Sequence, residues 1–234
     1  MNAPAGHMAP QLRPPLSLPV RAVMIDLDGT LLDTARDLTE AANAMLREFG
    51  RPALDIDTIR SYIGRGIANL VQRCFANDEP PTEALACFRR HYRESNGRYV
   101  TIYPGVVEGL RAMQAMGLPL ACVTNKASDF ALPLLELSGL AGWFGQIVCG
   151  DTLARAKPDP LPLLHICREF GIEPRQAVLI GDSLNDVNAA RAAGCPIICV
   201  PYGFTEGAAV RESDCDAIVP SLEAAARLLI KDRQ

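Results

Sequence analysis

The sequence of 234 residues has no long hydrophobic run and no excess of positive charge. No stretch approaches the roughly 20 apolar residues that a transmembrane helix needs, so we expect no membrane span. The 23 Lys and Arg residues are outnumbered by 27 Asp and Glu residues, which gives a formal net charge of −4. This balance argues against a nucleic-acid partner, because such binders need a basic surface.

Histidine is scarce, and the cysteines form no Cys-x-x-Cys motif. Only His7, His91 and His165 are present. Structural zinc sites normally use closely spaced Cys and His residues, so the sequence predicts no zinc site. Several of the eight cysteines lie in apolar stretches, and we expect all eight to be free, buried thiols in a reducing compartment.

The first 19 residues contain five prolines and no apolar h-region. This composition predicts a disordered tail over residues 1–19 and argues against a signal peptide. Met8 is a second possible initiator. Together with the free thiols, these features predict a cytoplasmic protein.

Short apolar stretches alternate with helical patterns along most of the chain. The expected strands are 21–27, 119–124, 146–149, 177–181 and 196–200, and the expected helices between them are 107–116, 127–138, 161–170 and 186–193. Continuous apolar strands are typical of parallel strands buried on both faces. The pattern therefore predicts an α/β fold with a doubly wound parallel sheet, that is, a Rossmann-like core.

One interval, 34–103, interrupts this alternation and has no convincing strand. Its helical patterns are 38–49, 56–63, 67–75 and 83–99. Thr34 followed three residues later by Asp37 favours a helix start, and Pro104–Gly105 marks the end. We therefore expect a core domain over 20–33 and 104–234, with a small helical cap domain over 34–103 inserted after the first strand.

Four acids are expected near the carboxyl ends of the strands, where open α/β sheets bind ligands. They are Asp26, Asp28, Asp182 and Asp186. Unpaired carboxylates are costly to bury together, and a hard divalent cation resolves this cost. The acids therefore predict a Mg²⁺ site.

Groups suited to a phosphate are expected at the same edge. Thr124 follows the second strand with Asn125 and Lys126, and Lys157 lies in a later loop. A hydroxyl, backbone amides and ammonium groups suit phosphate oxygens, so acids and donors together indicate phosphoryl transfer.

Asp26 and Asp28 are suited to two different parts of that chemistry. Asp26 can attack phosphorus and form an aspartyl-phosphate, while Asp28 can protonate the leaving group and then activate water. Gly29 would let the backbone turn sharply, so that the Asp28 carboxylate faces that of Asp26.

The order of these motifs resembles the haloacid dehalogenase superfamily of phosphatases. The matching segments are DLDGTLLD at 26–33, VTNK at 123–126, Lys157 in AKPDP, and GDSLND at 181–186. The resemblance implies that Asp26 is the nucleophile and a Mg²⁺ ligand, that Asp28 is the acid/base and offers its carbonyl to the metal, and that Asp182 binds the metal. It also implies that Thr124 and Asn125 bind the phosphoryl group, that Lys157 neutralises it, and that Asp186 is an additional or indirect metal contact.

Within this superfamily, residues 61–75, 103–113, 149–164 and 200–207 most resemble the phosphoglycolate phosphatases. The resemblance implies hydrolysis of 2-phosphoglycolate, a small phosphorylated metabolite of carbohydrate metabolism, by a monomer or homodimer. Arg65, which lies between two glycines, is our candidate for its carboxylate.

Several alternatives remain open. The substrate could be a sugar phosphate, N-acetylmuramate 6-phosphate or pyrophosphate, and the enzyme could be a sugar phosphomutase, although Thr30 favours hydrolysis. A phospho-aspartate signalling or binding module is an alternative of a different class. Asp28 argues against a dehalogenase. Some of these residues also have simple structural interpretations. Asp186 could be the N-cap of a helix, and Asp33 could cap or orient the linker. Lys157 and Arg65 could be surface side chains.

Overall fold

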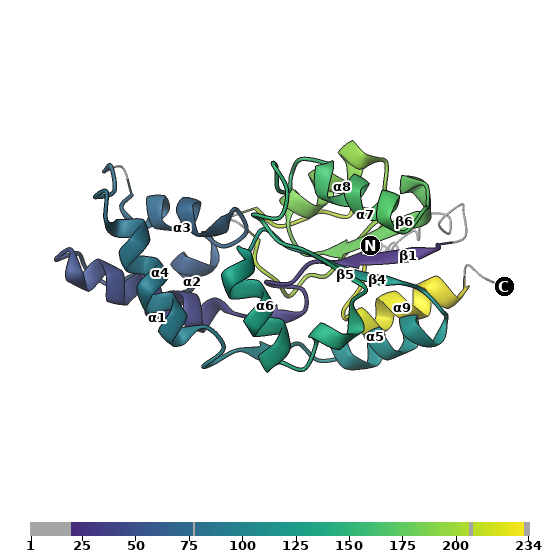
Figure 1. Cartoon of the computed structure of the whole chain (residues 1–234), viewed down its shortest axis with the longest axis horizontal. Helices are drawn as coiled ribbons and strands as arrows, with labels where there is room; N and C mark the ends of the chain where they lie inside the picture. Colours follow the sequence, from purple (N-terminus) through teal and green to yellow (C-terminus); the bar gives the residue numbers. More distant parts are fainter. Residues whose placement is uncertain (1–19, 77, 206–207, 232–234) are drawn as a thin grey trace, which may run out of the picture.

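A six-stranded parallel sheet organises the larger part of the computed structural model, which describes residues 20–76, 78–205 and 208–231 (Figure 1). The strand order is β5-β4-β1-β6-β7-β8. The strands are β1 (Ala22–Ile25), β4 (Leu120–Val123), β5 (Gln146–Val148), β6 (Ala177–Gly181), β7 (Ile197–Cys199) and β8 (Ala217–Ile218). The predicted parallel α/β sheet is therefore confirmed, while the predicted tail, 1–19, lies outside the described residues.

Helices cover both faces of this sheet (Figure 1). One face packs against α5 (Val106–Ala115), α6 (Ser128–Leu137) and α9 (Leu222–Lys231), and the other against α7 (Leu161–Glu169) and α8 (Leu184–Ala193). The central strand serves both layers, since Val23 and Ile25 join the first core and Met24 joins the second. This explains why β1 is apolar at every position instead of alternating.

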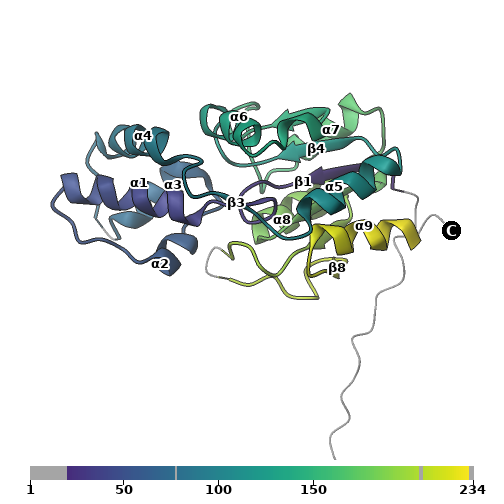
Figure 2. The same cartoon turned by 90° about the horizontal axis from the view of Figure 1, so that it is seen from below.

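The helices α1 (Ala35–Glu48), α2 (Ile56–Arg60), α3 (Gly66–Cys74) and α4 (Ala84–Ser95) lie to one side of the sheet (Figures 1 and 2). They share a separate apolar cluster, whose largest buried side chains include Phe88 and Tyr92. Phe130 of α6 and Phe204 also join this cluster. We keep the division into a core and a cap over 34–103 as a proposal, which the separate apolar cluster of α1–α4 supports.

The prediction that 34–103 contains no strand was wrong. β2 (Leu32–Asp33) pairs antiparallel with β3 (Thr101–Ile102), so the chain leaves and re-enters the core through a two-stranded ribbon. Both residues of β3 are exposed, so the strand has no buried face and no alternating apolar pattern that the sequence could reveal.

The sequence interpretation also omitted β8 and α9. β8 has only two residues, too few for a periodic pattern. α9 carries buried Leu222, Ala225, Ala226 and Leu229 at helical spacing, a signal that could have been found. Two short 3₁₀ helices, Ala141–Trp143 and Pro174–Gln176, complete the described elements.

All eight cysteines lie in the described part of the chain, and all are buried and unbridged, as predicted. Among the helices that the structure describes, none combines the length and apolarity needed to cross a membrane.

Candidate active site

Three buried carboxylates meet at the carboxyl edge of the sheet. Asp26 directly follows β1, Asp182 directly follows β6, and Asp186 lies in the first turn of α8. One oxygen of each lies within 4.8 Å of the others, and none of the three residues is more than 8% exposed. We call these residues the acid edge.

Lys157 is the cation that faces the acid edge. Its Nζ lies 2.8 Å from Asp26 Oδ1 and 2.6 Å from Asp186 Oδ1, and it also donates to the Val123 carbonyl at 2.7 Å. Burial alone would lower the pKa of Lys157, but the Asp186 and Asp26 carboxylates outweigh it and raise that pKa. Lys157 is therefore a buried ammonium at the site. The alternative that it is a surface side chain was wrong.

One lysine does not balance three carboxylates. Burial raises the pKa of Asp26 to about 7; Lys157 opposes this rise and Asp186 adds to it. Burial, Asp26 and Asp186 likewise raise the pKa of Asp182 well above its usual value. Apart from its ion pair with Lys157, buried Asp26 Oδ1 has no hydrogen-bond partner in the described part of the chain. This cluster of oxygen donors fits a hard divalent cation such as Mg²⁺.

Asp182 is fixed by its neighbours in a crowded space. Its Oδ1 accepts from the Thr30 hydroxyl at 2.7 Å, and its Oδ2 accepts from the Phe204 amide at 2.6 Å. Gly29, with φ +88°, passes so close that a Cβ there would lie 2.3 Å from Asp182 Oδ2. Gly29 is therefore needed both for its positive φ and for this close approach.

Asp186 contacts Lys157 through one oxygen and the start of α8 through the other. Its Oδ2 accepts from the Ser183 amide at 3.1 Å and the Ser183 hydroxyl at 2.8 Å. The alternative that Asp186 is the N-cap was wrong, because Ser183 is the N-cap and Asp186 is its capping-box partner. With both oxygens so engaged, Asp186 is better placed to orient Lys157 than to contribute a free ligand.

Asp28 occupies a second polar cluster beside the acid edge. Lys126 Nζ lies 3.1 Å from Asp28 Oδ1, and the Thr34 hydroxyl donates to the same oxygen at 2.7 Å. Lys126 Nζ also donates to the Tyr92 hydroxyl of α4. The acid/base candidate is thus held by Lys126 of the core and by Thr34, the first residue of the proposed cap, while Tyr92 of the cap contacts Lys126.

The sequence interpretation missed three of these positioning residues. Lys126 was noted after the second strand but was not predicted to be a site residue, although VTNK carries it there. Thr30 was weighed only as a feature of the motif. No sequence pattern indicated a site role for Tyr92, because a tyrosine within a helical pattern is usually interpreted as a core residue.

Thr124 and Asn125 follow β4, as predicted. Thr124 is buried, and its hydroxyl accepts from the Lys126 amide at 3.1 Å. Asn125 Nδ2 donates to the carbonyls of Lys157, at 2.7 Å, and of Gly64 in the cap, at 2.9 Å. Asn185 Nδ2 donates to the same Gly64 carbonyl at 3.2 Å. Two core amides therefore converge on one carbonyl of the cap, and we call this contact the Gly64 clasp.

A pocket lies between the two polar clusters and the cap. Its polar lining is Asp26, Asp28, Thr124, Asn125 and Lys126, and its cap lining is Leu38, Ile63, Gly64, Gly66, Ile67 and Leu70. Arg65, our candidate for a substrate carboxylate, is exposed and is not among the lining residues, although both neighbouring glycines are. The structure thus brings Asp26, Asp28, Thr124 and Asn125 to one pocket and leaves the Arg65 side chain outside its lining.

Asp33 does orient the linker. Its Oδ1 accepts from the Ala35 amide at 3.1 Å, and its Oδ2 pairs with Arg60 at 2.8 Å.

Comparison with known proteins shows that the chain is similar to one family of hydrolases. The model of the haloacid dehalogenase-like hydrolases matches residues 23–200. A phosphoglycolate phosphatase of Thiobacillus denitrificans is 52% identical over 221 residues, covering 92% of this chain and 97% of that protein. One of Nitrosospira multiformis is 53% identical with the same coverage.

A solved structure is similar to this chain in both fold and sequence. The crystal structure of a "predicted phosphoglycolate phosphatase" from Haemophilus somnus is 30% identical, with a TM-score of 0.84, and the match covers 93% of this chain and 100% of that one. The family resemblance inferred from the four motifs is therefore confirmed.

Proposed function

The chain belongs to the haloacid dehalogenase-like hydrolase family, and we propose that it is a Mg²⁺-dependent phosphatase that hydrolyses 2-phosphoglycolate to glycolate and phosphate. The reaction would proceed through an aspartyl-phosphate on Asp26.

The observation that carries this proposal is the division of Asp26 and Asp28 between two environments. Asp26 lies on the acid edge with Lys157, whereas Asp28, two residues later, lies with Lys126 and Thr34. Both carboxylates line one pocket. Two acids held apart by separate counterions are suited to separate roles, as nucleophile and as acid/base.

In the first step, an oxygen of Asp26 attacks phosphorus and the bond from phosphorus to the substrate oxygen breaks. Asp28 gives its proton to that departing oxygen, which leaves glycolate. Lys157, 2.8 Å from Asp26 Oδ1, offsets negative charge on the nucleophile and on the phosphoryl group.

In the second step, Asp28 takes a proton from a water that attacks the phosphorus of the aspartyl-phosphate. The bond from phosphorus to Asp26 breaks, and inorganic phosphate leaves. The carboxylates return to their starting states, with Asp28 carrying the proton for the next cycle.

Asp26, Asp182 and the Asp28 carbonyl would hold Mg²⁺, with Asp186 positioning Lys157 beside them. Bound Mg²⁺ would neutralise the acid edge and the phosphate that approaches it.

The substrate assignment depends on the relatives and on the pocket. Relatives at 52–53% identity over almost their whole length are named phosphoglycolate phosphatases. The side chains of Leu38, Ile63, Ile67 and Leu70 line the cap side of the pocket and offer no hydrogen bonds to the hydroxyls of a sugar, which favours a smaller substrate.

The test is phosphate release from 2-phosphoglycolate, glucose phosphates, glycerol 3-phosphate, N-acetylmuramate 6-phosphate and pyrophosphate, each with Mg²⁺ or with EDTA. We expect metal-dependent release with kcat/KM for 2-phosphoglycolate at least about tenfold ahead, which is about 1.4 kcal/mol of discrimination. Preference for another compound would overturn the substrate assignment but would not contradict the proposed phosphatase mechanism. No release from any of them by folded protein would overturn the phosphatase itself.

A further inference from the structure

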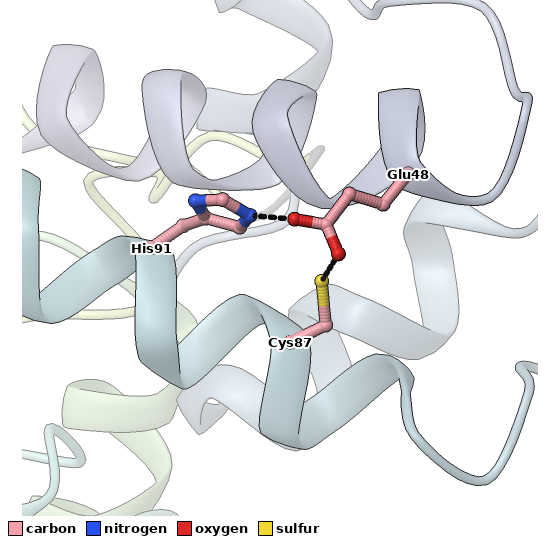
Figure 3. Close-up of side chains that lie close together, drawn as sticks. All are labelled: Glu48, Cys87 and His91. Carbon is pink, nitrogen blue, oxygen red and sulfur yellow. Dashed lines mark hydrogen bonds and ion pairs between the residues drawn. The ribbon is translucent and has the colours of Figure 1, made fainter.

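We propose that the cap carries a Zn²⁺ site, separate from the acid edge, formed by Glu48, Cys87 and His91. Figure 3 shows the three side chains pointing toward one another from two helices. Glu48 is the last residue of α1, and Cys87 and His91 lie one turn apart on α4. The sequence predicted no zinc site, because histidine is scarce and no Cys-x-x-Cys motif is present; a site of this kind instead needs Glu48, about forty residues away, beside Cys87 and His91.

The three ligand atoms are already gathered. One atom of each residue lies within 4.8 Å of the others. Glu48 Oε1 lies 2.6 Å from His91 Nε2, and Cys87 Sγ lies 3.4 Å from Glu48 Oε2. Ligand atoms around a tetrahedral Zn²⁺ are about 3.3–3.8 Å apart, given bond lengths of about 2.0–2.3 Å, so movements of about 1 Å would complete the site.

The donor set is chemically suited to zinc and unsuited to Mg²⁺. A thiol sulfur, an imidazole nitrogen and one carboxylate oxygen match the softer ligands that Zn²⁺ accepts, whereas Mg²⁺ prefers oxygen alone. Three protein ligands leave a fourth position for water.

A positive group already occupies this place. The Arg90 guanidinium lies 2.7 Å from both oxygens of Glu48 and 3.4 Å from Cys87 Sγ. The Arg90 side chain is 54% exposed, so it can swing into water when a metal enters. Zn²⁺ would replace the guanidinium and the thiol proton, which goes to solvent, and would join the last turn of α1 to α4.

The experiment is a Co²⁺ titration of the metal-free, full-length protein in excess Mg²⁺, which keeps the acid edge filled. Co²⁺ reports a bound thiolate through an ultraviolet charge-transfer band, and Zn²⁺ should then displace it. We expect one equivalent to bind, with the band lost in Cys87→Ser and the affinity at least about tenfold weaker in His91→Gln.

Matched variants make the assignment specific. Cys74→Ser removes another buried thiol of the cap cluster, and His165→Gln removes a histidine of the core. Both should leave the titration unchanged. Arg90→Gln should tighten binding about two- to fivefold, since it removes an exposed ion pair with which the metal competes.

Three results would overturn the proposal. They are the absence of a thiolate band in folded wild-type protein, a band that persists in Cys87→Ser, and a band lost equally in Cys74→Ser. Unchanged affinity in Arg90→Gln would overturn the exchange between guanidinium and metal. Far-UV circular dichroism confirms the fold of each variant, and none of these readouts depends on phosphatase activity.

Discussion

Asp26 and Asp28 are separated by one residue, yet each meets a different lysine. The residue between them, Leu27, is completely buried and anchors the turn, since its carbonyl accepts from the amides of Leu31 and Leu32. A buried apolar side chain thus fixes the two carboxylates on either side of it.

Replacing Asp26 with Asn tests the nucleophile. We expect kcat to fall by at least about a thousandfold, because an amide cannot form the phosphoenzyme. Phosphate release and trapping of acid-quenched phosphoenzyme measure the effect. Asp57→Asn, at an exposed position of α2, is the control and should retain wild-type activity. Residual activity above a few per cent in Asp26→Asn would remove Asp26 from its role.

Lys157→Met tests the counterion. The variant buries three carboxylates without their ammonium, and breaking such a buried pair costs about 3–5 kcal/mol. We expect the free energy of unfolding in EDTA to fall by about 3 kcal/mol, and by less in Mg²⁺, because the metal replaces part of the lost charge. Urea unfolding measures both.

Arg155→Met is the matched control for Lys157, since its side chain is 72% exposed and its partner Asp159 lies one turn away. A change within about 0.5 kcal/mol is expected there. Equal losses in the two variants would contradict the role of Lys157 as the counterion of the acid edge.

Between elements, the Gly64 clasp joins the loop that precedes α3 to the loop after β4 and to the first turn of α8. The clasp contains no charge, so it can open and close without the large desolvation cost of an ion pair. Gly64 and Asn125 both line the pocket, so we expect the clasp to hold the cap against the core while substrate is bound.

Asn185→Ala should weaken this clasp. Losing a neutral hydrogen bond of about 1 kcal/mol predicts a roughly fivefold fall in kcat/KM. Amide hydrogen exchange across residues 61–67 should rise at the same time, a change that a purely local role in α8 would not produce. Asn188→Ala, on the exposed side of the same helix, should alter neither quantity. Unchanged exchange in Asn185→Ala would contradict the clasp.

The predicted elements of the core were recognisable because their strands are apolar except at Gln146 of β5, and because a helical pattern follows most of them. β6 was predicted with its observed bounds, and α6 and α7 to within one residue. β3 was missed because exposed strands of two residues leave no pattern. Its partner β2 follows the turn at Gly29, whose amide donates to the Leu32 carbonyl at 2.9 Å.

Across the whole molecule, the order of the motifs predicted which residues lie at the sheet edge, but not which would pair. Topology brings the ends of β1, β4 and β6 together, so Asp26, Thr124 and Asp182 could be foreseen as neighbours. The contact of Lys126, the partner of Asp28, with Tyr92 depends on how α4 packs over the core. The Glu48, Cys87 and His91 cluster depends on the pairing of α1 with α4, which no local pattern specifies.

The acid edge should also govern the stability of the whole chain. The pKa of Asp26 is raised from 3.8 to about 7, and that of Asp182 is raised too, chiefly by burial. Between pH 4 and 7 the metal-free folded state therefore holds protons that the unfolded state has released. Its free energy of unfolding should fall as pH rises through this window, by up to about 1.4 kcal/mol per pH unit for each such group.

Bound Mg²⁺ should remove that slope, because the cation replaces the protons and favours the ionised acids. Urea unfolding at pH 5 and pH 7, in EDTA and in saturating Mg²⁺, measures the difference. Asp182→Asn should reduce the slope in EDTA, leaving the part due to Asp26, and should lose most of the stabilisation by Mg²⁺, whereas Asp57→Asn should behave as wild type. If the slopes in EDTA and Mg²⁺ were equal, the acid edge would not be the metal site, since a ligand that binds only the folded state must raise its stability.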